Sequence, residues 1–338
     1  MSETSPARYD IYGMGNALLD TEVEIDDAFL ARLGIEKGMM TLVDAARQRE
    51  LLAALTAHSP AHRRASGGSA ANSIIAAQYF GSRTFFSCRV AHDEAGDFYL
   101  GDMEKAGVAV NRSARGNGVT GRCLVMITPD AERTMHTFLG ISETLDRADL
   151  DDDAIRASHW TYLEGYLASS ATGREAAMHA RRIARTAGRR VAMTFSDPAM
   201  VQYFRDGLVT MLGDGVDLLF CNHVEAQLWT GTEKVEDAAS LLKSAAGSFV
   251  ITCGGDGALA WDGKDLHRIA ATPVKPVDTN GAGDMFAGAF LHALNRGLDF
   301  PSAGRLASIA AARVVSNFGP RLQPAEHAGV LTAAGIRA

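Results

Sequence analysis

A glycine-rich turn that leads into an apolar helical pattern carries the most chemically suggestive residues of the sequence. The turn covers residues 278–283, Asp284 follows it, and residues 285–294 have the apolar pattern of a helix. The first N–H groups of a helix lack intrahelical partners and the helix dipole favours negative charge, so a phosphate cradle is predicted at Gly281, Ala282 and Gly283. We expect Gly283 to need both open space and an unusual backbone angle.

Asp284 is the unusual residue of this turn. A phosphate repels a carboxylate beside it, unless the carboxylate has a function such as accepting the proton of a hydroxyl that attacks the phosphate. A second interpretation is that Asp284 merely caps the helix, because capping by Asp is common and contributes about 1 kcal/mol.

Two further motifs accompany the turn. Residues 66–73 read Ser-Gly-Gly-Ser-Ala-Ala-Asn-Ser before an alanine-rich helical run, and residues 222–225 read Asn-His-Val-Glu after an apolar run. Together with Asp-Thr-x-Gly-Ala-Gly-Asp they resemble the signatures of the ribokinase-like (PfkB) carbohydrate and nucleoside kinases, in the same order and over nearly the whole chain. The resemblance implies one ribokinase-like α/β domain over residues 1–338, with a central, mostly parallel sheet flanked by helices and a small β-sheet lid.

The alternation of short apolar runs with longer alanine-rich segments predicts the same class of fold. The strand-like runs are residues 191–195, 218–221 and 249–253, and the helix-like segments are residues 174–187 and 235–246. This alternation is typical of a parallel sheet with helices on both faces. Ligands of such sheets bind at the carboxyl ends of the strands, where Asn222, Gly254 and Gly255 are expected.

Two regions, residues 16–45 and 119–141, break this alternation and have the patterns of hairpin strands. Members of the resembled family cover the substrate with a small sheet, so we assign both regions to such a lid, which would keep water from competing for the phosphoryl group. Arg133 lies in the second region. It could neutralise the transferred phosphoryl group from the lid, or it could be an ordinary surface residue.

Residues 12–20 read Tyr-Gly-Met-Gly-Asn-Ala-Leu-Leu-Asp and resemble the N-terminal strand and turn of adenosine kinases within the family. This resemblance implies that the sugar is held by Asn16, Asp20, Gly67, Gly68 and Asn72. A carboxylate can accept two hydroxyl hydrogen bonds, so Asp20 suits a vicinal diol, although it could also be a solvated acid at a strand end. Tyr166 is the candidate platform on which the base stacks, or else a plain core tyrosine.

ATP and Mg²⁺ are the cofactors that the resemblance implies. Asn222 and Glu225 would position Mg²⁺ through water, since hard oxygen ligands suit this ion. His223 departs from the family, in which many members carry an acid at this position. Further residues are expected to border the nucleotide, namely Thr252, Gly254, Gly255, Gly257 and Asn317. A monovalent cation such as K⁺ activates many members, and its expected site is Asp278, Thr279 and Gly319.

Composition restricts the class of protein. The chain has 338 residues, of which 47% are hydrophobic, and a net charge of −7 with a pI near 5.8, which argues against nucleic acid as a partner. The sequence shows neither 18 consecutive apolar residues nor a signal-peptide pattern, so we expect a cytoplasmic protein without membrane contact. Its four widely spaced cysteines are expected to be reduced. We expect a monomer or homodimer.

The predicted reaction is transfer of the γ-phosphoryl group of ATP to the 5′-hydroxyl of a purine nucleoside, adenosine in the first place. A kinase for a free sugar such as ribose or fructose, or for inosine or guanosine, is the alternative within the same family. A ligand sensor without catalytic activity is the alternative from another class. The presence of Asp284 and of both phosphate motifs argues against a sensor.

Overall fold

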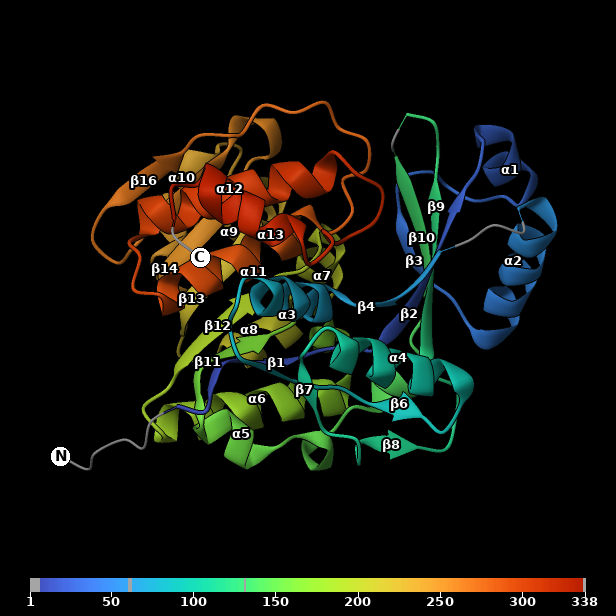
Figure 1. The fold of residues 1–338 in the computed structure, drawn as a ribbon, viewed down its shortest axis with the longest axis horizontal. Helices are drawn as coiled ribbons and strands as arrows, with labels where there is room; N and C mark the ends of the chain where they lie inside the picture. The colour runs from blue at the N-terminus through green and yellow to red at the C-terminus, as the bar shows by residue number, and fades with distance from the viewer. Residues whose placement is uncertain (1–6, 60–62, 131, 337–338) are drawn as a thin grey trace.

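Two sheets of unequal size organise the computed structural model, which describes residues 7–59, 63–130 and 132–336 (Figure 1). The first six residues, in which no signal peptide is expected, lie outside the described residues. So does Ala131 of the second predicted lid region. None of the described helices combines the length and the apolar character that crossing a membrane requires.

The large sheet has nine strands, in the order β16 (Leu266–Ile269), β15 (Ala258–Trp261), β14 (Ala246–Thr252), β13 (Val216–Asn222), β12 (Arg190–Thr194), β11 (Ser158–Leu163), β1 (Tyr9–Met14), β5 (Thr84–Ser87) and β7 (Ala109–Val110). The strands from β14 to β7 are parallel, and β15 and β16 complete one edge as antiparallel strands. This confirms the predicted, mostly parallel sheet. The strand β14 begins at Ala246, so the helix predicted over residues 235–246 is too long.

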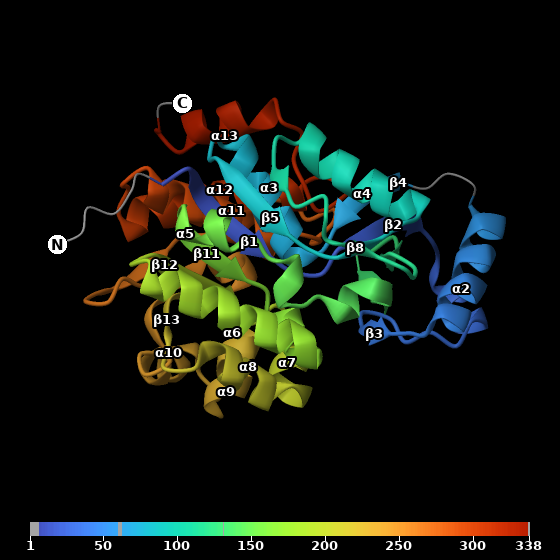
Figure 2. The ribbon, with the colours of Figure 1, turned by 90° about the horizontal axis from the view of Figure 1, so that it is seen from below.

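Helices cover both faces of the large sheet (Figure 2). One face carries α3 (Ser69–Tyr79), α4 (Glu94–Lys105), α11 (Ala282–Asn295), α12 (Phe300–Val315) and α13 (Glu326–Ala333). The other face carries α5 (Asp152–Arg156), α6 (Ala171–Thr186), α7 (Pro198–Tyr203), α8 (Arg205–Leu212), α9 (His223–Thr230) and α10 (Val235–Leu242). In α6 the buried residues recur every three or four positions, and Ser170 caps the Gly173 N–H, so the sequence itself specifies this amphipathic helix.

The small sheet has five strands, in the order β3 (Met40–Leu42), β10 (Arg133–Phe138), β9 (Gly121–Ile127), β2 (Leu18–Glu24) and β4 (Arg63–Gly67). The hairpin predicted over residues 119–141 is confirmed, because β9 and β10 pair antiparallel. The hairpin predicted over residues 16–45 is wrong, because β2 pairs with β9 and β4 whereas β3 pairs with β10. The intervening helix α1 (Asp27–Arg32) separates β2 from β3, and with α2 (Ala45–His58) it packs on β2 and β9.

Short elements complete the chain. The strands β6 (Val90–Ala91) and β8 (Arg115–Gly116) pair with each other. Four described 3₁₀ helices lie in connections, namely η1 (Gly140–Thr144), η2 (Arg147–Asp149), η3 (Gly165–Ser169) and η4 (Gly254–Asp256).

The helices α3 and α11 approach each other closely at Gly288. A Cβ atom at this position would lie 2.3 Å from the Ser73 carbonyl oxygen and 2.8 Å from the Ala76 Cβ, so only glycine allows the observed separation of the two helices. Their N-termini carry the two glycine motifs of the sequence. The crossing therefore fixes how these motifs lie relative to each other.

We expect Gly288→Ala to destabilise the protein by about 1–3 kcal/mol, since the added methyl group must push the two helices apart. Gly101→Ala is the matched control, because a Cβ at this position of α4 meets nothing within 4 Å. Without a clash, a helical Gly→Ala change should stabilise by roughly 0.5–1 kcal/mol. Urea unfolding measures both changes, and equal stability of the two variants would contradict the close crossing.

Candidate active site

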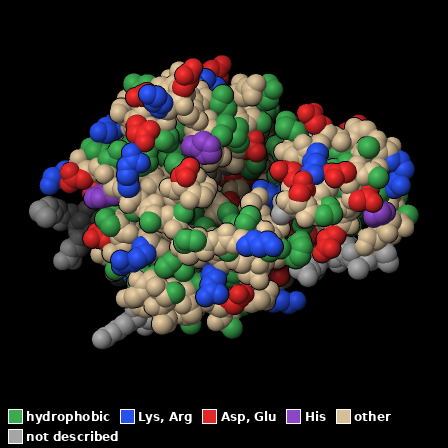
Figure 3. Space-filling model, turned by 90° about the horizontal axis from the view of Figure 1, so that it is seen from above, with side chains coloured by type: hydrophobic (Ala, Val, Ile, Leu, Met, Phe, Trp, Pro, Cys, Tyr) green, Lys and Arg blue, Asp and Glu red, His purple; other side chains and the backbone are tan. Residues whose placement is uncertain are grey.

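A cavity of about 430 Å³ lies where the carboxyl ends of the parallel strands face the small sheet. Figure 3 shows the surface hollowed between the large body and the part that carries the small sheet. The cavity wall includes residues at or just beyond the ends of three strands, namely Glu164 after β11, Thr194 of β12 and Asn222 of β13. This is the edge at which parallel sheets bind ligands.

Asp284 is held by two donors from α3. The Ser69 Oγ donates a hydrogen bond to Oδ1 at 2.6 Å, and the Asn72 Nδ2 donates to Oδ2 at 3.1 Å. The N-cap of α11 is Gly281, and α11 has no side-chain cap, so the capping interpretation of Asp284 is wrong. Burial raises the pKa of Asp284, while Ser69, Asn72 and the charge of Arg133 oppose this shift.

The glycines of the turn have different functions in the structure. Gly281 has a φ of 70°, and a Cβ there would lie 2.3 Å from the Pro320 carbonyl oxygen. Gly283 has no positive φ, and a Cβ there would meet nothing within 4 Å. The unusual backbone angle expected at Gly283 therefore belongs to Gly281, whereas the space beside Gly283 is open. Ala282 lines the cavity between them.

Arg133 reaches from the small sheet to this turn. Its Nη1 donates to the Asn280 Oδ1 at 2.8 Å, and its Nε lies 3.8 Å from the Asp278 Oδ1. The side chain is 22% exposed and lines the cavity, so the surface interpretation is wrong. Arg133 is also the only lysine or arginine among the described residues of the cavity wall.

The residues expected at the acceptor end lie together. The cavity wall includes five of the six, namely Asn16, Asp20, Gly68, Asn72 and Tyr166. Gly67 does not line the cavity. A Cβ at Gly67 would lie 2.0 Å from the Asp20 Oδ2, so this glycine makes room for the Asp20 carboxylate. Tyr166 is partly buried against the core and also faces the cavity.

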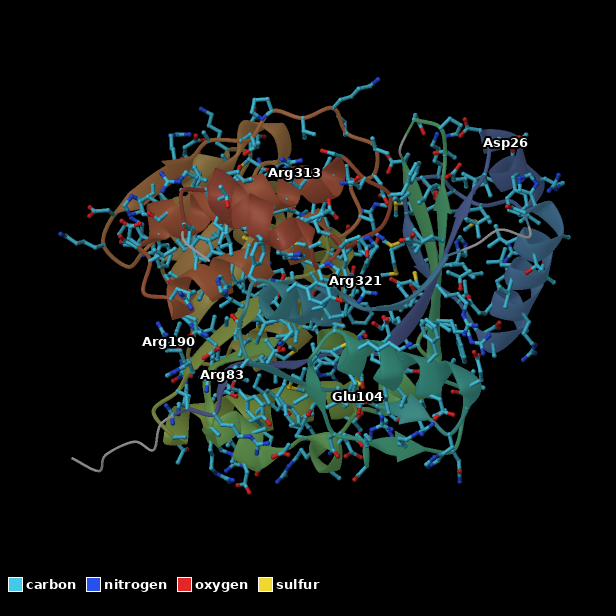
Figure 4. All side chains as sticks on the ribbon, viewed as in Figure 1. Asp26, Arg83, Glu104, Arg190, Arg313 and Arg321 are labelled. Carbon is cyan, nitrogen blue, oxygen red and sulfur yellow. The ribbon has the colours of Figure 1, made fainter. Side chains whose placement is uncertain are left out.

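Asp20 is not the solvated acid that the sequence left open. Asp20 is only 6% exposed. Burial, and after it the negative charge of Glu22, raises the pKa of the Asp20 carboxyl group to about 8. The nearby charge of Arg321 opposes this shift. Arg321 lies beside β4 (Figure 4), where it donates to the Ser66 Oγ and to the Asp102 Oδ2.

Glu164 is a site residue that the sequence analysis missed. It is fully buried and accepts hydrogen bonds from the Asn16 N–H, the Asn16 Nδ2 and the Ala70 N–H at 2.9–3.2 Å. Burial raises its pKa to about 7, although these donors oppose the shift. Gly15 leaves room for it, since a Cβ there would lie 2.2 Å from the Glu164 Oε2. Its position directly after a buried strand was the available signal.

Asn222 and Glu225 form a capping box at the start of α9. The Glu225 N–H donates to the Asn222 Oδ1, and Glu225 accepts from the Asn222 N–H and from Nδ2 at 2.7–3.0 Å. Burial raises the pKa of Glu225 to about 8. Both residues line the cavity together with Thr252 and Thr279. His223, the departure from the family pattern, is outside the cavity wall.

The described residues contain no cluster of three or more His, Cys, Asp or Glu side chains that could hold a metal ion. Mg²⁺ in nucleotide sites needs only one or two carboxylates of the protein, since the ion keeps several waters and binds substrate phosphates. Glu225 lines the same cavity as residues 281–283. Glu225 therefore fits Mg²⁺ held through water.

Several predicted nucleotide residues do not line the cavity. These are Gly254, Gly255, Gly257 and Asn317. Gly257 has a φ of 88°, and a Cβ there would lie 2.0 Å from the Ile269 carbonyl oxygen, so the turn between β14 and β15 accounts for this glycine. Asn317 donates from its Nδ2 to the Arg313 carbonyl at 2.8 Å and so binds the end of α12.

The residues expected to bind a monovalent cation are partly assembled. Asp278 is fully buried and accepts from the Gly319 N–H at 2.9 Å and from the Asn280 N–H at 2.8 Å. Thr279 lines the cavity instead. The carboxylate of Asp278 therefore joins the loop after α12 to the glycine-rich turn.

Comparisons with known proteins relate most of the chain to one family. The family model described as pfkB family carbohydrate kinase matches residues 38–327. The crystal structure of a probable sugar kinase from Rhizobium etli superposes with a TM-score of 0.91 at 31% identity, covering 97% of this chain and 99% of that chain. The adenosine kinase from Sinorhizobium meliloti gives a TM-score of 0.89 at 33% identity, with the same coverage. The adenosine kinase of Saccharomyces cerevisiae is 26% identical over 91% of this chain and 95% of its own length. The chain therefore belongs to the pfkB family of carbohydrate kinases.

Proposed function

We propose that the chain transfers the γ-phosphoryl group of ATP to the 5′-hydroxyl of a purine nucleoside, with adenosine as the preferred acceptor. The observation that carries the proposal is the single cavity that contains both a phosphate cradle with the carboxylate of Asp284 and the buried carboxylate of Asp20. The resemblance to the adenosine kinase from Sinorhizobium meliloti supports the choice of acceptor.

In this mechanism Asp284 accepts the proton of the attacking hydroxyl, and Ser69 and Asn72 keep its carboxylate oriented. The N–H groups of Gly281 and Gly283 donate to the oxygens of the transferring group, whereas the Ala282 N–H already donates to the Thr279 carbonyl at 3.4 Å. Arg133 contributes a positive charge from the small sheet. Mg²⁺-ATP, when bound, supplies the phosphoryl group and leaves as ADP. The open space beside Gly283 fits a phosphate there, and Asn222, Glu225 and Thr252 would lie on the nucleotide side.

The acceptor is a nucleoside in this proposal because apolar side chains of the small sheet line the same cavity as Tyr166. The apolar side chains that the small sheet contributes to the cavity wall are those of Leu18, Met40, Leu42, Cys123, Val125 and Met135. A base can be buried against these side chains and the ring of Tyr166, while a free sugar would leave them unused. The small sheet then acts as the lid that excludes water from the transfer.

A kinase for a free sugar is the second candidate. The resemblance to the probable sugar kinase from Rhizobium etli favours it. A substrate panel separates the two candidates, with ADP formation measured for adenosine, inosine, guanosine, ribose and fructose in the presence of Mg²⁺-ATP. We expect the highest kcat/KM for adenosine. Preference for a free sugar would exclude the nucleoside and leave the phosphotransferase in place.

Asp20→Ala should lower kcat/KM for adenosine roughly ten- to a hundredfold for each lost hydroxyl contact, because a buried hydrogen bond between the carboxyl group and the sugar is removed. In the wild type, 2′-deoxyadenosine should show a loss of similar size, since it lacks one partner of the carboxylate. With Asp20→Ala the difference between adenosine and 2′-deoxyadenosine should shrink. An unchanged ratio of the two substrates would show that Asp20 does not bind the diol.

Asp284→Asn should lower kcat by roughly 10²–10⁴, because the amide keeps the shape of the side chain and cannot accept the proton. Binding of ATP, measured by calorimetry, should persist. Asp237→Asn is the matched control, since Asp237 lies in the first turn of α10, is exposed and is remote from the cavity. Near-normal turnover of Asp284→Asn would remove the proton-transfer role.

Gly283→Val should fold and lose most of its activity, because the new side chain occupies the open space of the cradle. Gly281→Ala should instead lower Tm, since alanine at a φ of 70° is strained and meets the Pro320 carbonyl. Gly231→Ala is the control for strain alone, because Gly231 also has a φ of 70° but its Cβ would meet nothing within 4 Å. Full activity of a folded Gly283→Val protein would contradict the cradle.

A further inference from the structure

The turn that follows β12 is strained and faces the cavity. Ser196 has a φ of 72° and is the only residue other than glycine, within the described parts of the chain, with a positive φ. This conformation is costly for a residue with a side chain and persists where the surroundings hold it. Here the Ser196 Oγ accepts from the Gly165 N–H at 2.9 Å, and the Ser196 N–H donates to the Thr194 Oγ1 at 3.1 Å. The turn is thereby fixed against the start of η3.

This turn directs Asp197 to the cavity wall. Its Oδ1 accepts from the Ala199 N–H at 2.7 Å and so caps α7, while its Oδ2 has only the Tyr166 hydroxyl at 3.5 Å. An O–H···O hydrogen bond is normally 2.5–3.0 Å long, so this oxygen is poorly satisfied. No ion pair among the described residues includes Asp197; burial raises its pKa, and the charge of Arg133 opposes this shift. A ligand that brings an N–H donor would satisfy the oxygen.

The contact with Tyr166 gives the position of that donor. Tyr166 is the platform proposed for the base, and its hydroxyl end touches the carboxylate of Asp197. A base that stacks on this ring would therefore place one edge at the Asp197 Oδ2. The sugar would lie toward Asn16 and Asp20, which line the same cavity.

We propose that Asp197 determines the choice of base, by accepting a hydrogen bond from an exocyclic amino group such as that of adenine. A carboxylate can only accept, so a base with a carbonyl oxygen at this edge meets an electrostatic penalty. The inference rests on the proposed nucleoside kinase function and adds the group that distinguishes amino purines from oxo purines.

Asp197→Asn is the decisive variant, because asparagine also caps helices and keeps the start of α7. The test compares kcat/KM for adenosine, for inosine and for purine riboside, which lacks the amino group. We expect the variant to lower kcat/KM for adenosine roughly ten- to a hundredfold and to leave purine riboside within about twofold. The ratio of kcat/KM for inosine to that for adenosine should rise, because the amide of asparagine can donate to the carbonyl oxygen of inosine.

Asp197→Ser is the second variant, since serine also caps the helix but has no second oxygen at this position. Asp197→Ser should lower kcat/KM for adenosine as much as Asp197→Asn does. It should not raise kcat/KM for inosine relative to that for adenosine. Tyr166→Phe is the matched control that removes only the 3.5 Å hydroxyl contact, and it should leave the preference for adenosine over purine riboside intact.

Parallel losses for adenosine and purine riboside, or a raised KM for Mg²⁺-ATP, would assign Asp197 to the general architecture or to the nucleotide and would overturn the inference. A wild type that prefers adenosine, with an unchanged preference in both variants, overturns the inference and leaves the proposed function standing. A wild type that phosphorylates only free sugars overturns both.

Discussion

The close crossing of α3 and α11 at Gly288 is the constraint on which the site depends. The two helices carry motifs far apart in the sequence, and each helix alone provides only part of the chemistry. Because Gly288 lets the backbones touch, Ser69 and Asn72 reach both oxygens of Asp284 while the glycine turn remains open to the cavity. The rest of the large sheet holds these helices at the carboxyl ends of its strands, and Glu164 ties the start of α3 to β11 through Ala70.

The electrostatics of the cavity follow from this arrangement. The part of the cavity wall that the structure describes contains five carboxyl groups, and burial raises the pKa of each, namely Asp20, Glu164, Asp197, Glu225 and Asp284. The positively charged or polarised groups of the described cavity wall are the Arg133 guanidinium and the N–H groups at the start of α11. Among the described residues of the cavity wall, the cationic side chain thus lies at the glycine-rich turn, where the proposed phosphoryl transfer would take place. A chain with a net charge of −7 can therefore bind an anionic group at one place without attracting polyanions in general.

Local chemistry decided which parts could be predicted from the sequence. The glycine turn at Gly281 and the buried strands were recognisable because helix termini and apolar runs are properties of neighbouring residues. Strand pairing could not be predicted, since β2 pairs with β9, about a hundred positions away, and not with the nearby β3. Glu164 and Asp197 were also not predicted as site residues, because their contacts join parts of the chain that are far apart in the sequence. Gly257 was predicted to border the nucleotide, whereas its positive φ is required by the hairpin turn between β14 and β15.

The two donors on Asp284 differ in one respect that concerns what happens after the transfer. The Ser69 hydroxyl can rotate and become an acceptor, whereas the Asn72 amide nitrogen can only donate. A proton gained by Asp284 is therefore tolerated on Oδ1, where the Ser69 oxygen can receive it, and is opposed on Oδ2. Ser69 in turn lies beside the cavity and not within the core. In the proposed mechanism, the hydrogen bond between Asp284 and Ser69 would give the proton a short path away from Oδ1 before the next acceptor binds.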